Sequence, residues 1–208
     1  LFWSSNLTGS YLKNKVKDLA GVPFVSGISP ASGMIPTDGV TRIQEGYPIG
    51  TFYVYEWTGL DKDGKDTYKD NDGDGKVSGG DRVMKGQAAP KFTMGWNNSF
   101  SYKNWSLNMF FNAAFGGYRL NLMRFTGCSI NGDSNFITLR EAYNRSVGHS
   151  DNPRYPSTSV VGNDYEAAST KWLEKNDYLR LENITLSYDL GRSITKFADI
   201  RLSFSAQN

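Results

Sequence analysis

Lys91-Phe-Thr-Met-Gly-Trp-Asn-Asn-Ser-Phe-Ser-Tyr102 is followed, after Lys103-Asn104, by Trp105-Ser-Leu-Asn-Met-Phe-Phe-Asn-Ala-Ala114. Large apolar side chains recur at every second position in both stretches, and small polar or small side chains fill the positions between them. Phe110 is the exception on the polar side. A period of two predicts a strand. The short break at Lys103-Asn104 therefore predicts a β-hairpin.

The same alternation returns near the end of the sequence. It covers residues 183–190, where Ile184 and Leu186 belong to the apolar set, and residues 200–207. Two further strand candidates lie upstream, at Leu1–Leu12 and Thr51–Trp57. Segments of about ten residues with an apolar face and a small polar face are typical of transmembrane β-barrels. We therefore expect an all-β fold: a portion of an antiparallel, up-and-down transmembrane barrel, incomplete in this chain.

Composition excludes several classes of function. The formal net charge is +2, from 23 basic and 21 acidic residues, without a basic stripe that nucleic acid would require. Cys128 is the single cysteine, which excludes a disulfide framework and a cysteine-rich zinc site. His149, the single histidine, lies in a polar, loop-like stretch. With so little material for a nucleophile and base pair, we expect no catalytic residues and no enzyme activity.

The connections between the strand candidates are unequal. Lys103-Asn104 is very short, whereas residues 116–177 form a long connection with a possible short helix from Phe136 to Arg145. Outer-membrane barrels have short turns on one side and long extracellular loops on the other. Strand parity places the acidic segment 70–81 and the loop 116–177 on the extracellular side. The stretch Lys13–Pro48 is too long for a periplasmic turn, which predicts additional strands there.

Residues 70–81 read Asp-Asn-Asp-Gly-Asp-Gly-Lys-Val-Ser-Gly-Gly-Asp, which is the spacing of a twelve-residue calcium loop. The flanking residues lack a helical period, so this loop is not part of a paired EF-hand. A solvated turn cluster is the alternative, because Asp, Asn and Gly also form tight turns. We expect a structural Ca²⁺ here, with candidate ligands Asp70, Asp72, Asp74, the Lys76 carbonyl, Ser78 and Asp81.

At this level of detail the sequence resembles the SusC/RagA-like TonB-linked outer-membrane transporters. Phrases similar to those of the family run along nearly the whole chain, in order: residues 10–19, 45–55, 68–75, 178–188 (Tyr-Leu-Arg-Leu-Glu-Asn-Ile-Thr-Leu-Ser-Tyr) and 205–208. Leu12 and Val54 depart from the family pattern, which has Asn and Gly there. The resemblance implies a C-terminal barrel piece (1–208) without the family's N-terminal plug domain and last strand.

The resemblance also implies a function: TonB-energised import of oligosaccharides or peptides across the outer membrane of a Gram-negative bacterium, with a SusD-like surface lipoprotein as a lid. Aromatic side chains of the long loop could stack on a ligand or pack against the lid, namely Tyr143, Tyr155, Tyr165 and Trp172. Each could equally fold the loop on itself or belong to the interfacial girdle.

A soluble alternative remains open on the sequence alone. It is a secreted, calcium-stabilised β-sandwich that binds carbohydrate. In such a fold two apolar sheet faces pack together, and small polar residues should not dominate the face opposite the aromatic side chains. A dockerin-like module would need a second calcium loop, and the sequence contains no second copy.

Overall fold

The computed structural model describes residues 1–27, 39–128, 139–142, 154–155, 168–191 and 198–208. These residues form two compact units, each assembled from separate segments of the chain. The first unit comprises Leu1–Lys13, Pro90–Gly117 and Asn176–Asn208, and the second comprises Asn14–Ala89 and Tyr118–Lys175. Among the described residues, no helix has the length and hydropathy needed to cross a bilayer.

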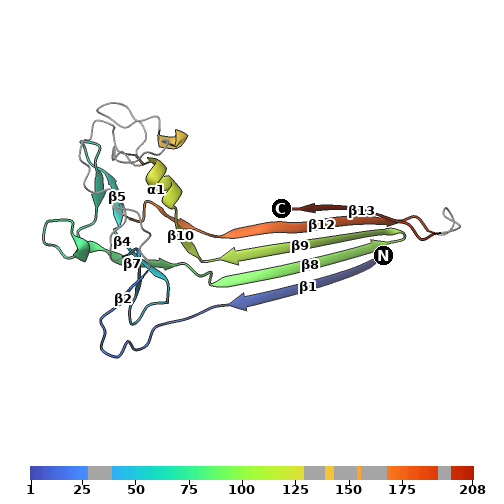
Figure 1. The fold of residues 1–208 in the computed structure, drawn as a ribbon, viewed down its shortest axis with the longest axis horizontal. Helices are drawn as coiled ribbons and strands as arrows, with labels where there is room; N and C mark the ends of the chain where they lie inside the picture. Colours follow the sequence, from blue (N-terminus) through green and yellow to red (C-terminus); the bar gives the residue numbers. More distant parts are fainter. Residues whose placement is uncertain (28–38, 129–138, 143–153, 156–167, 192–197) are drawn as a thin grey trace. The chain divides into compact units, whose positions relative to one another are not determined.

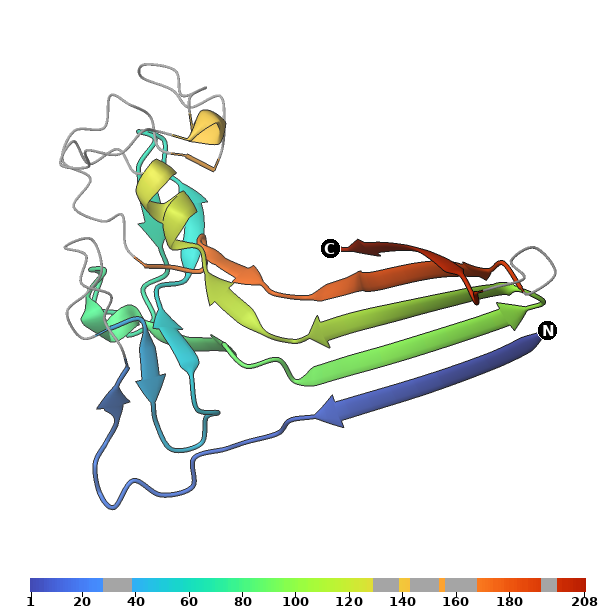
Figure 2. The ribbon, with the colours of Figure 1, turned by 45° about the vertical axis from the view of Figure 1, so that its right-hand side comes forward.

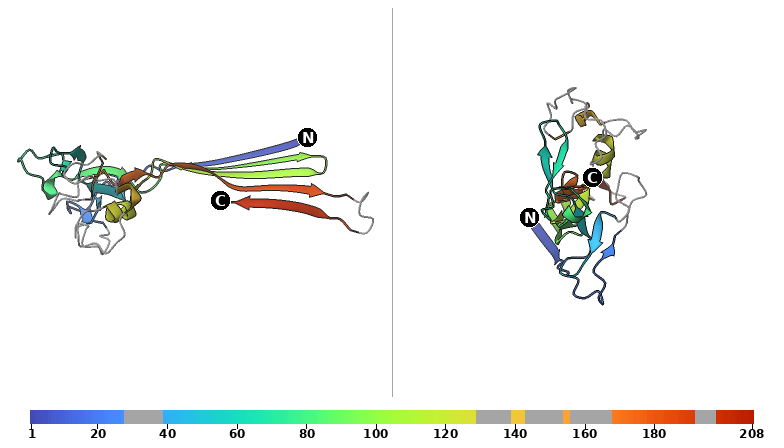
Figure 3. Two further views of the ribbon diagram at one scale, coloured as in Figure 1. Left: turned by 90° about the horizontal axis from the view of Figure 1, so that it is seen from above. Right: turned by 90° about the vertical axis from the view of Figure 1, so that its left-hand side faces the viewer.

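The first unit is one five-stranded antiparallel sheet with the order β1-β8-β9-β12-β13 (Figure 1). Its strands are β1 (Phe2–Tyr11), β8 (Phe92–Tyr102), β9 (Trp105–Phe115), β12 (Tyr178–Asp189) and β13 (Arg201–Gln207). Figure 3 shows the five strands side by side in a twisted layer. The predicted hairpin is confirmed: β8 and β9 pair from Phe92↔Phe115 to Tyr102↔Trp105, and Lys103 turns with φ 52°.

A register shift in β12 keeps its apolar side chains on one face. Leu181 lies opposite Phe111, but Asn183 lies opposite Phe110, so Glu182 is the extra residue of a bulge. Without it Leu181 and the downstream Ile184 would point to opposite faces, because side chains alternate along a strand. The bulge therefore brings apolar residues at odd positions before it and at even positions after it onto the same face of the sheet.

The second unit contains short strands and helical turns, and its segment Asn14–Ala89 is drawn in blue to green in Figure 2. One sheet has the order β2-β3-β4-β7, and two-stranded sheets pair β5 with β6 and β10 with β11. The bounds are β2 (Val25–Ser26), β3 (Thr41–Ile43), β4 (Thr51–Val54), β5 (Trp57–Leu60), β6 (Asp66–Tyr68), η1 (Gly79–Asp81), β7 (Val83–Gln87), β10 (Tyr118–Leu120), α1 (Leu122–Cys128), η2 (Arg140–Ala142) and β11 (Leu173–Lys175).

The core of the second unit joins β4 to residues of the long 116–177 connection. Its buried members are Val40, Phe52, Val54, Phe125, Cys128, Ala142, Tyr155, Ala168 and Trp172. The Phe125 and Trp172 rings meet edge to face with centroids 5.7 Å apart. Aromatic pairs of this geometry add to the free energy gained from burial alone. Segments far apart in sequence are thus fixed to each other by this core.

Three expectations about the second unit need correction or qualification. The predicted single strand Thr51–Trp57 is divided into β4 and β5, because Tyr55 exchanges backbone hydrogen bonds with Ala168 and Thr170. Since β1 pairs directly with β8, residues 13–48 belong to one long connection between them, which contains the additional strands β2 and β3. Most of the predicted helix Phe136–Arg145 lies outside the described residues, and its described part contains the 3-10 turn η2.

Candidate functional site

The five-stranded sheet has two chemically different faces. One carries cross-strand rows of large apolar side chains, for example Trp3↔Phe100↔Leu107↔Leu186↔Phe204. The opposite face carries rows of small polar ones, for example Ser4↔Ser99↔Asn108↔Thr185↔Ser205. Within this unit the apolar face is open: Phe204 is 71% exposed and Leu7 63%. A sheet with an uncovered apolar face fits a lipid environment far better than water.

Aromatic side chains gather at both ends of the apolar face. One terminal row contains Tyr102, Trp105 and Tyr188, and the other contains Phe92 and Phe115. The rings of Trp105 and Tyr188 lie 4.6 Å apart, and those of Phe92 and Phe115 lie 6.4 Å apart. Transmembrane barrels have such aromatic girdles where the strands meet the two membrane interfaces.

Two polar side chains interrupt the apolar face, and indole groups bond to both. Trp96 Nε1 donates to Ser5 Oγ at 2.8 Å, and Trp3 Nε1 donates to Asn98 Oδ1 at 3.3 Å. Hydrocarbon offers no alternative hydrogen-bond partners, so such bonds lower the cost of placing Ser5 and Asn98 on this face. Asn98 Nδ2 is buried and has no partner in the described part of the chain.

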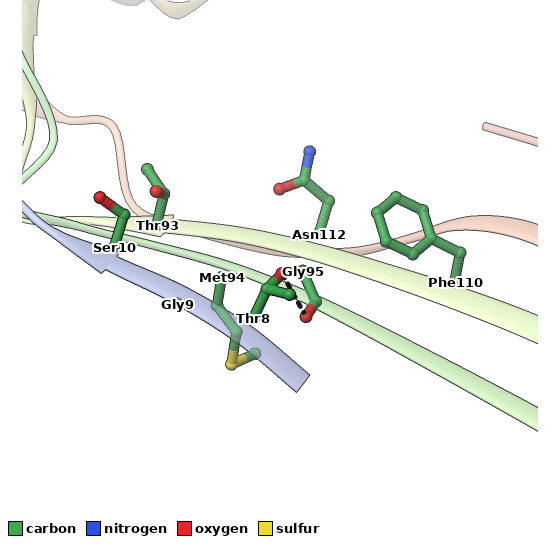
Figure 4. Close-up of a pocket in the computed structure, with 8 residues that line it drawn as sticks. All are labelled: Thr8, Gly9, Ser10, Thr93, Met94, Gly95, Phe110 and Asn112. Atoms are coloured by element: carbon green, nitrogen blue, oxygen red, sulfur yellow. Dashed lines mark hydrogen bonds between the residues drawn. The ribbon is translucent and has the colours of Figure 1, made fainter. Parts of the chain in front are cut away.

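The polar face is hollowed near the ends of β1, β8 and β9. The hollow has a volume of about 300 Å³. In Figure 4, Ser10, Thr93, Asn112 and Phe110 point to one side of the sheet, whereas Met94 points to the other. Phe110, the exception in the sequence pattern, lies over Gly95: a Cβ there would be 3.5 Å from its ring. The aromatic side chain thus covers backbone that the glycine leaves bare.

The acidic loop brings three of its six candidate ligands together. Oxygen atoms of Asp70, Asp72 and Asp74 lie within 4.8 Å of one another. Gly75, at the position where a calcium loop needs glycine, has φ +82°. Its N–H donates to Asp70 Oδ2 at 2.9 Å. The Asp74 N–H lowers the pKa of the Asp72 carboxyl, but burial and the charges of the neighbouring carboxylates outweigh it and raise the pKa overall. A cation would relieve this repulsion.

The remaining candidate ligands lie outside that group of three. Asp81 is fully buried and accepts N–H bonds from Ser78 at 2.6 Å and Asn71 at 2.7 Å, which lower the pKa of its carboxyl. Ser78 Oγ accepts from the Gly80 N–H at 3.1 Å as the N-cap of η1. The Lys76 N–H donates to Asp74 Oδ1 at 2.8 Å. Asp81 and Ser78 therefore hold the end of the loop in place.

The aromatic candidates occupy buried positions where they can be described. Tyr155 and Trp172 are each 1% exposed and belong to the core of the second unit. Burial raises the pKa of Tyr155 to about 12, and its hydroxyl accepts from Arg124 Nη2 at 3.0 Å. Both rings therefore pack in the core that joins the loop to β4. Tyr143 and Tyr165 lie outside the described residues.

The sequence analysis missed two charged clusters in this unit. Lys171 Nζ forms a buried ion pair with Asp66, at 2.8 and 2.9 Å from its two carboxylate oxygens. Arg124 binds Glu141 through two bonds of 2.8 Å and Glu174 through one of 2.5 Å. No local pattern marks these partners, because Asp66 and Lys171 are 105 residues apart.

Comparison with known proteins identifies the class of protein that has these features. The fold and the two-faced sheet are those of a portion of an antiparallel outer-membrane barrel. The solved structure of the RagAB peptide transporter superposes with a TM-score of 0.75 at 21% identity, covering 99% of this chain and 23% of that one. The RagAB peptide importer in its "closed-closed" state matches with the same TM-score at 22% identity, again over 99% of this chain and 23% of that one.

Curated relatives give the same result at the level of sequence. TonB-dependent receptor P3 of Formosa agariphila is 30% identical over 99% of this chain and 22% of its own length. TonB-dependent receptor SusC of Bacteroides thetaiotaomicron is 22% identical over 89% of this chain and 18% of its own length. No family model matches the chain. The chain is thus a segment of the SusC/RagA-like TonB-dependent transporter type, spanning about a fifth of the length of the curated relatives it matches.

Proposed function

We propose that this chain forms barrel wall and loops of a TonB-dependent transporter in the outer membrane of a Gram-negative bacterium. The transporter would import oligosaccharides or peptides with a SusD-like surface lipoprotein as its lid and TonB as its source of energy. The observation that carries the proposal is the open apolar face of the five-stranded sheet opposite a face of small polar side chains. The named relatives are receptors and a transporter, in keeping with a chain that has no catalytic role.

The dimensions of the apolar face support this assignment. Phe92 and Tyr102 mark its aromatic ends on β8 and lie ten residues apart, which is roughly 33 Å at about 3.3 Å per residue. Strands in membrane barrels tilt by about 40°, which reduces this length to roughly 25 Å across the bilayer. That is the height of the apolar band of outer-membrane barrels.

Cell fractionation tests the location. We expect the protein in detergent-solubilised outer membrane, with a SusD-like lipoprotein copurifying with it. A monomer that is soluble without detergent would contradict the proposal and favour the β-sandwich alternative. Uptake of labelled oligosaccharides and of labelled peptides, compared between wild-type and gene-deleted cells with and without TonB, distinguishes the two substrate classes.

The acidic loop would contribute a structural calcium site to the same protein. The converging carboxylates of Asp70, Asp72 and Asp74 and the raised pKa of Asp72 support this part of the proposal. Oxygen ligands at this spacing suit Ca²⁺, whose binding free energy would then help to order the loop.

Metal analysis of protein purified without chelator tests the calcium site. We expect bound calcium that is lost in the double variant Asp70→Ala/Asp74→Ala and retained in Asp63→Ala, which removes an exposed carboxylate from a neighbouring turn. Chelator should also increase protease cleavage near the loop. If chelator leaves both calcium content and cleavage unchanged, the segment is only a turn.

A further inference from the structure

Four side chains stack in a row across the sheet β2-β3-β4-β7. The Arg42 guanidinium lies 3.8 Å from the centroid of the Phe24 ring and 3.5 Å from that of the Tyr53 ring. The Arg82 guanidinium lies 4.6 Å from the centroid of Tyr53. The order of the stack is therefore aromatic, cation, aromatic, cation. We call this row Phe24, Arg42, Tyr53 and Arg82 the arginine ladder.

Register explains why the ladder forms on the face opposite the core. Arg42 on β3 pairs with Thr51 on β4, so Arg42, Thr51 and Tyr53 share one face. Phe52 and Val54 point to the other face, where they belong to the buried core. The ladder therefore lies on a sheet whose other face packs in the core, and Arg42 remains partly exposed.

The Arg42 guanidinium is held in position between the Phe24 and Tyr53 rings. Rings on both sides of the guanidinium restrict its rotamers, which pre-organises the planar fork of donors. Among the described residues, no hydrogen bond or ion pair joins the Arg42 guanidinium to a protein group.

We propose that the arginine ladder is a binding site for a carboxylate, with Arg42 as the bidentate donor. A guanidinium fork matches the two oxygens of a carboxylate in geometry and charge. Tyr53 does not serve as a stacking platform for a sugar, because guanidinium groups lie against its ring. The ligand class is thus an acidic peptide or a sugar acid, which share this group.

Direct binding measurements on the detergent-purified protein test the site. The probes are a glutamate tripeptide and an oligogalacturonide, each compared with a neutral counterpart, a glutamine tripeptide and a maltooligosaccharide. We expect an acidic probe to bind more tightly than its neutral counterpart, with higher salt weakening the binding. The acidic probe that binds identifies the source of the carboxylate. Binding of neither acidic probe, or equal binding of acidic and neutral probes, overturns the proposal.

Variants connect the binding to Arg42. Arg42→Gln should weaken binding of the acidic probe by about 10- to 100-fold, the usual effect of losing charge-assisted hydrogen bonds. Arg42→Lys keeps the charge but loses the fork, so we expect it to weaken binding as well. Arg119→Gln, at an exposed arginine of β10, is the matched control and should leave the affinity unchanged.

Two results would overturn the assignment of Arg42: acidic-probe binding that survives Arg42→Gln, or an equal loss in Arg119→Gln. Hydrogen exchange of β3 and β4 in the Arg42→Lys variant verifies that the sheet is intact. The test of the carboxylate site does not depend on the proposed transport function, because the assay measures binding without uptake. Failure of the import assay with intact acidic-probe binding would therefore count against the proposed function alone.

Discussion

Breaking the buried ion pair between Asp66 and Lys171 should open the second unit locally. Their side chains are 1% and 0% exposed, and Trp57 Nε1 also donates to Asp66 Oδ1 at 2.7 Å. Asp66→Asn keeps the shape and the acceptor for Trp57 but removes the negative charge that lies 2.8 Å from the Lys171 ammonium. Removing one partner of a buried pair costs about 3–5 kcal/mol.

Aromatic rings around the ammonium reduce this cost. Lys171 Nζ lies 4.7 Å from the centroid of Trp172, 5.5 Å from that of Trp57 and 5.7 Å from that of Tyr155. Cation–π attraction contributes up to roughly 2 kcal/mol where water is excluded. We therefore expect a net loss of roughly 2–4 kcal/mol for Asp66→Asn.

Hydrogen exchange measures this loss where it occurs. Since 1.4 kcal/mol corresponds to a factor of ten in an opening equilibrium, the amides of β5 and β6 should exchange roughly 30- to 1000-fold faster in Asp66→Asn. Adding Lys171→Met removes the buried ammonium as well and should restore much of the protection. A local measurement is needed because unfolding of a protein with separate compact units is not generally two-state.

The exposed pair between Lys69 and Glu56 provides the control. Its N–O distance is 3.9 Å, and the side chains are 58% and 35% exposed. Exposed pairs contribute about 0–1 kcal/mol, so Lys69→Gln, which removes this pair alone, should change exchange less than about fivefold. The reasoning fails if Asp66→Asn behaves like Lys69→Gln, or if the double variant with Lys171→Met is no better protected than Asp66→Asn alone.

Other predictions follow from the sheet and from the arginine cluster. Met109→Arg places a charge mid-strand on the apolar face and should cost about 2–4 kcal/mol in the membrane, whereas Asn108→Arg on the polar face should be tolerated. The folded fraction in heat-modifiability gels measures both. Arg124 lowers the pKa of the Glu141 and Glu174 carboxyls. Their stabilisation is therefore present above the ordinary glutamate pKa and lost as pH falls through the lowered values. Protease resistance should drop on acidification in wild type and depend less on pH in Arg124→Met.

The alternating strands were predictable because their signal is local. Alternation along residues 91–114 is visible without knowledge of any other segment, and the structure pairs these residues in the expected register. The sequence also indicates the bulge at Glu182, because the apolar residues change from odd to even positions there. Periodicity can therefore locate strands and irregularities within strands.

Contacts within the second unit depend on pairings that local patterns do not encode. The arginine ladder requires residues 24 and 82, each next to a strand end, to lie beside one sheet, and Lys171 must reach Asp66 across 105 residues. Tyr155 and Trp172 illustrate the same limit, because aromatic residues in a loop suit ligand stacking and core packing equally well. Their burial at 1% exposure distinguishes these roles in the structure.

The acidic loop and the arginine ladder share a physical connection through Gly79. Its carbonyl accepts from the Tyr53 hydroxyl at 3.4 Å and from Arg82 Nε at 3.4 Å. Gly79 is the first residue of η1, whose last residue, Asp81, holds the backbone of the acidic loop through Asn71. Ordering the loop would thus restrict Gly79, and with it the Tyr53 and Arg82 side chains that donate to its carbonyl. By thermodynamic reciprocity, a carboxylate bound at the ladder would favour the cation-bound loop to the same extent. In a cation-bound protein the order of the loop would thus affect how the neighbouring sheet presents the ladder.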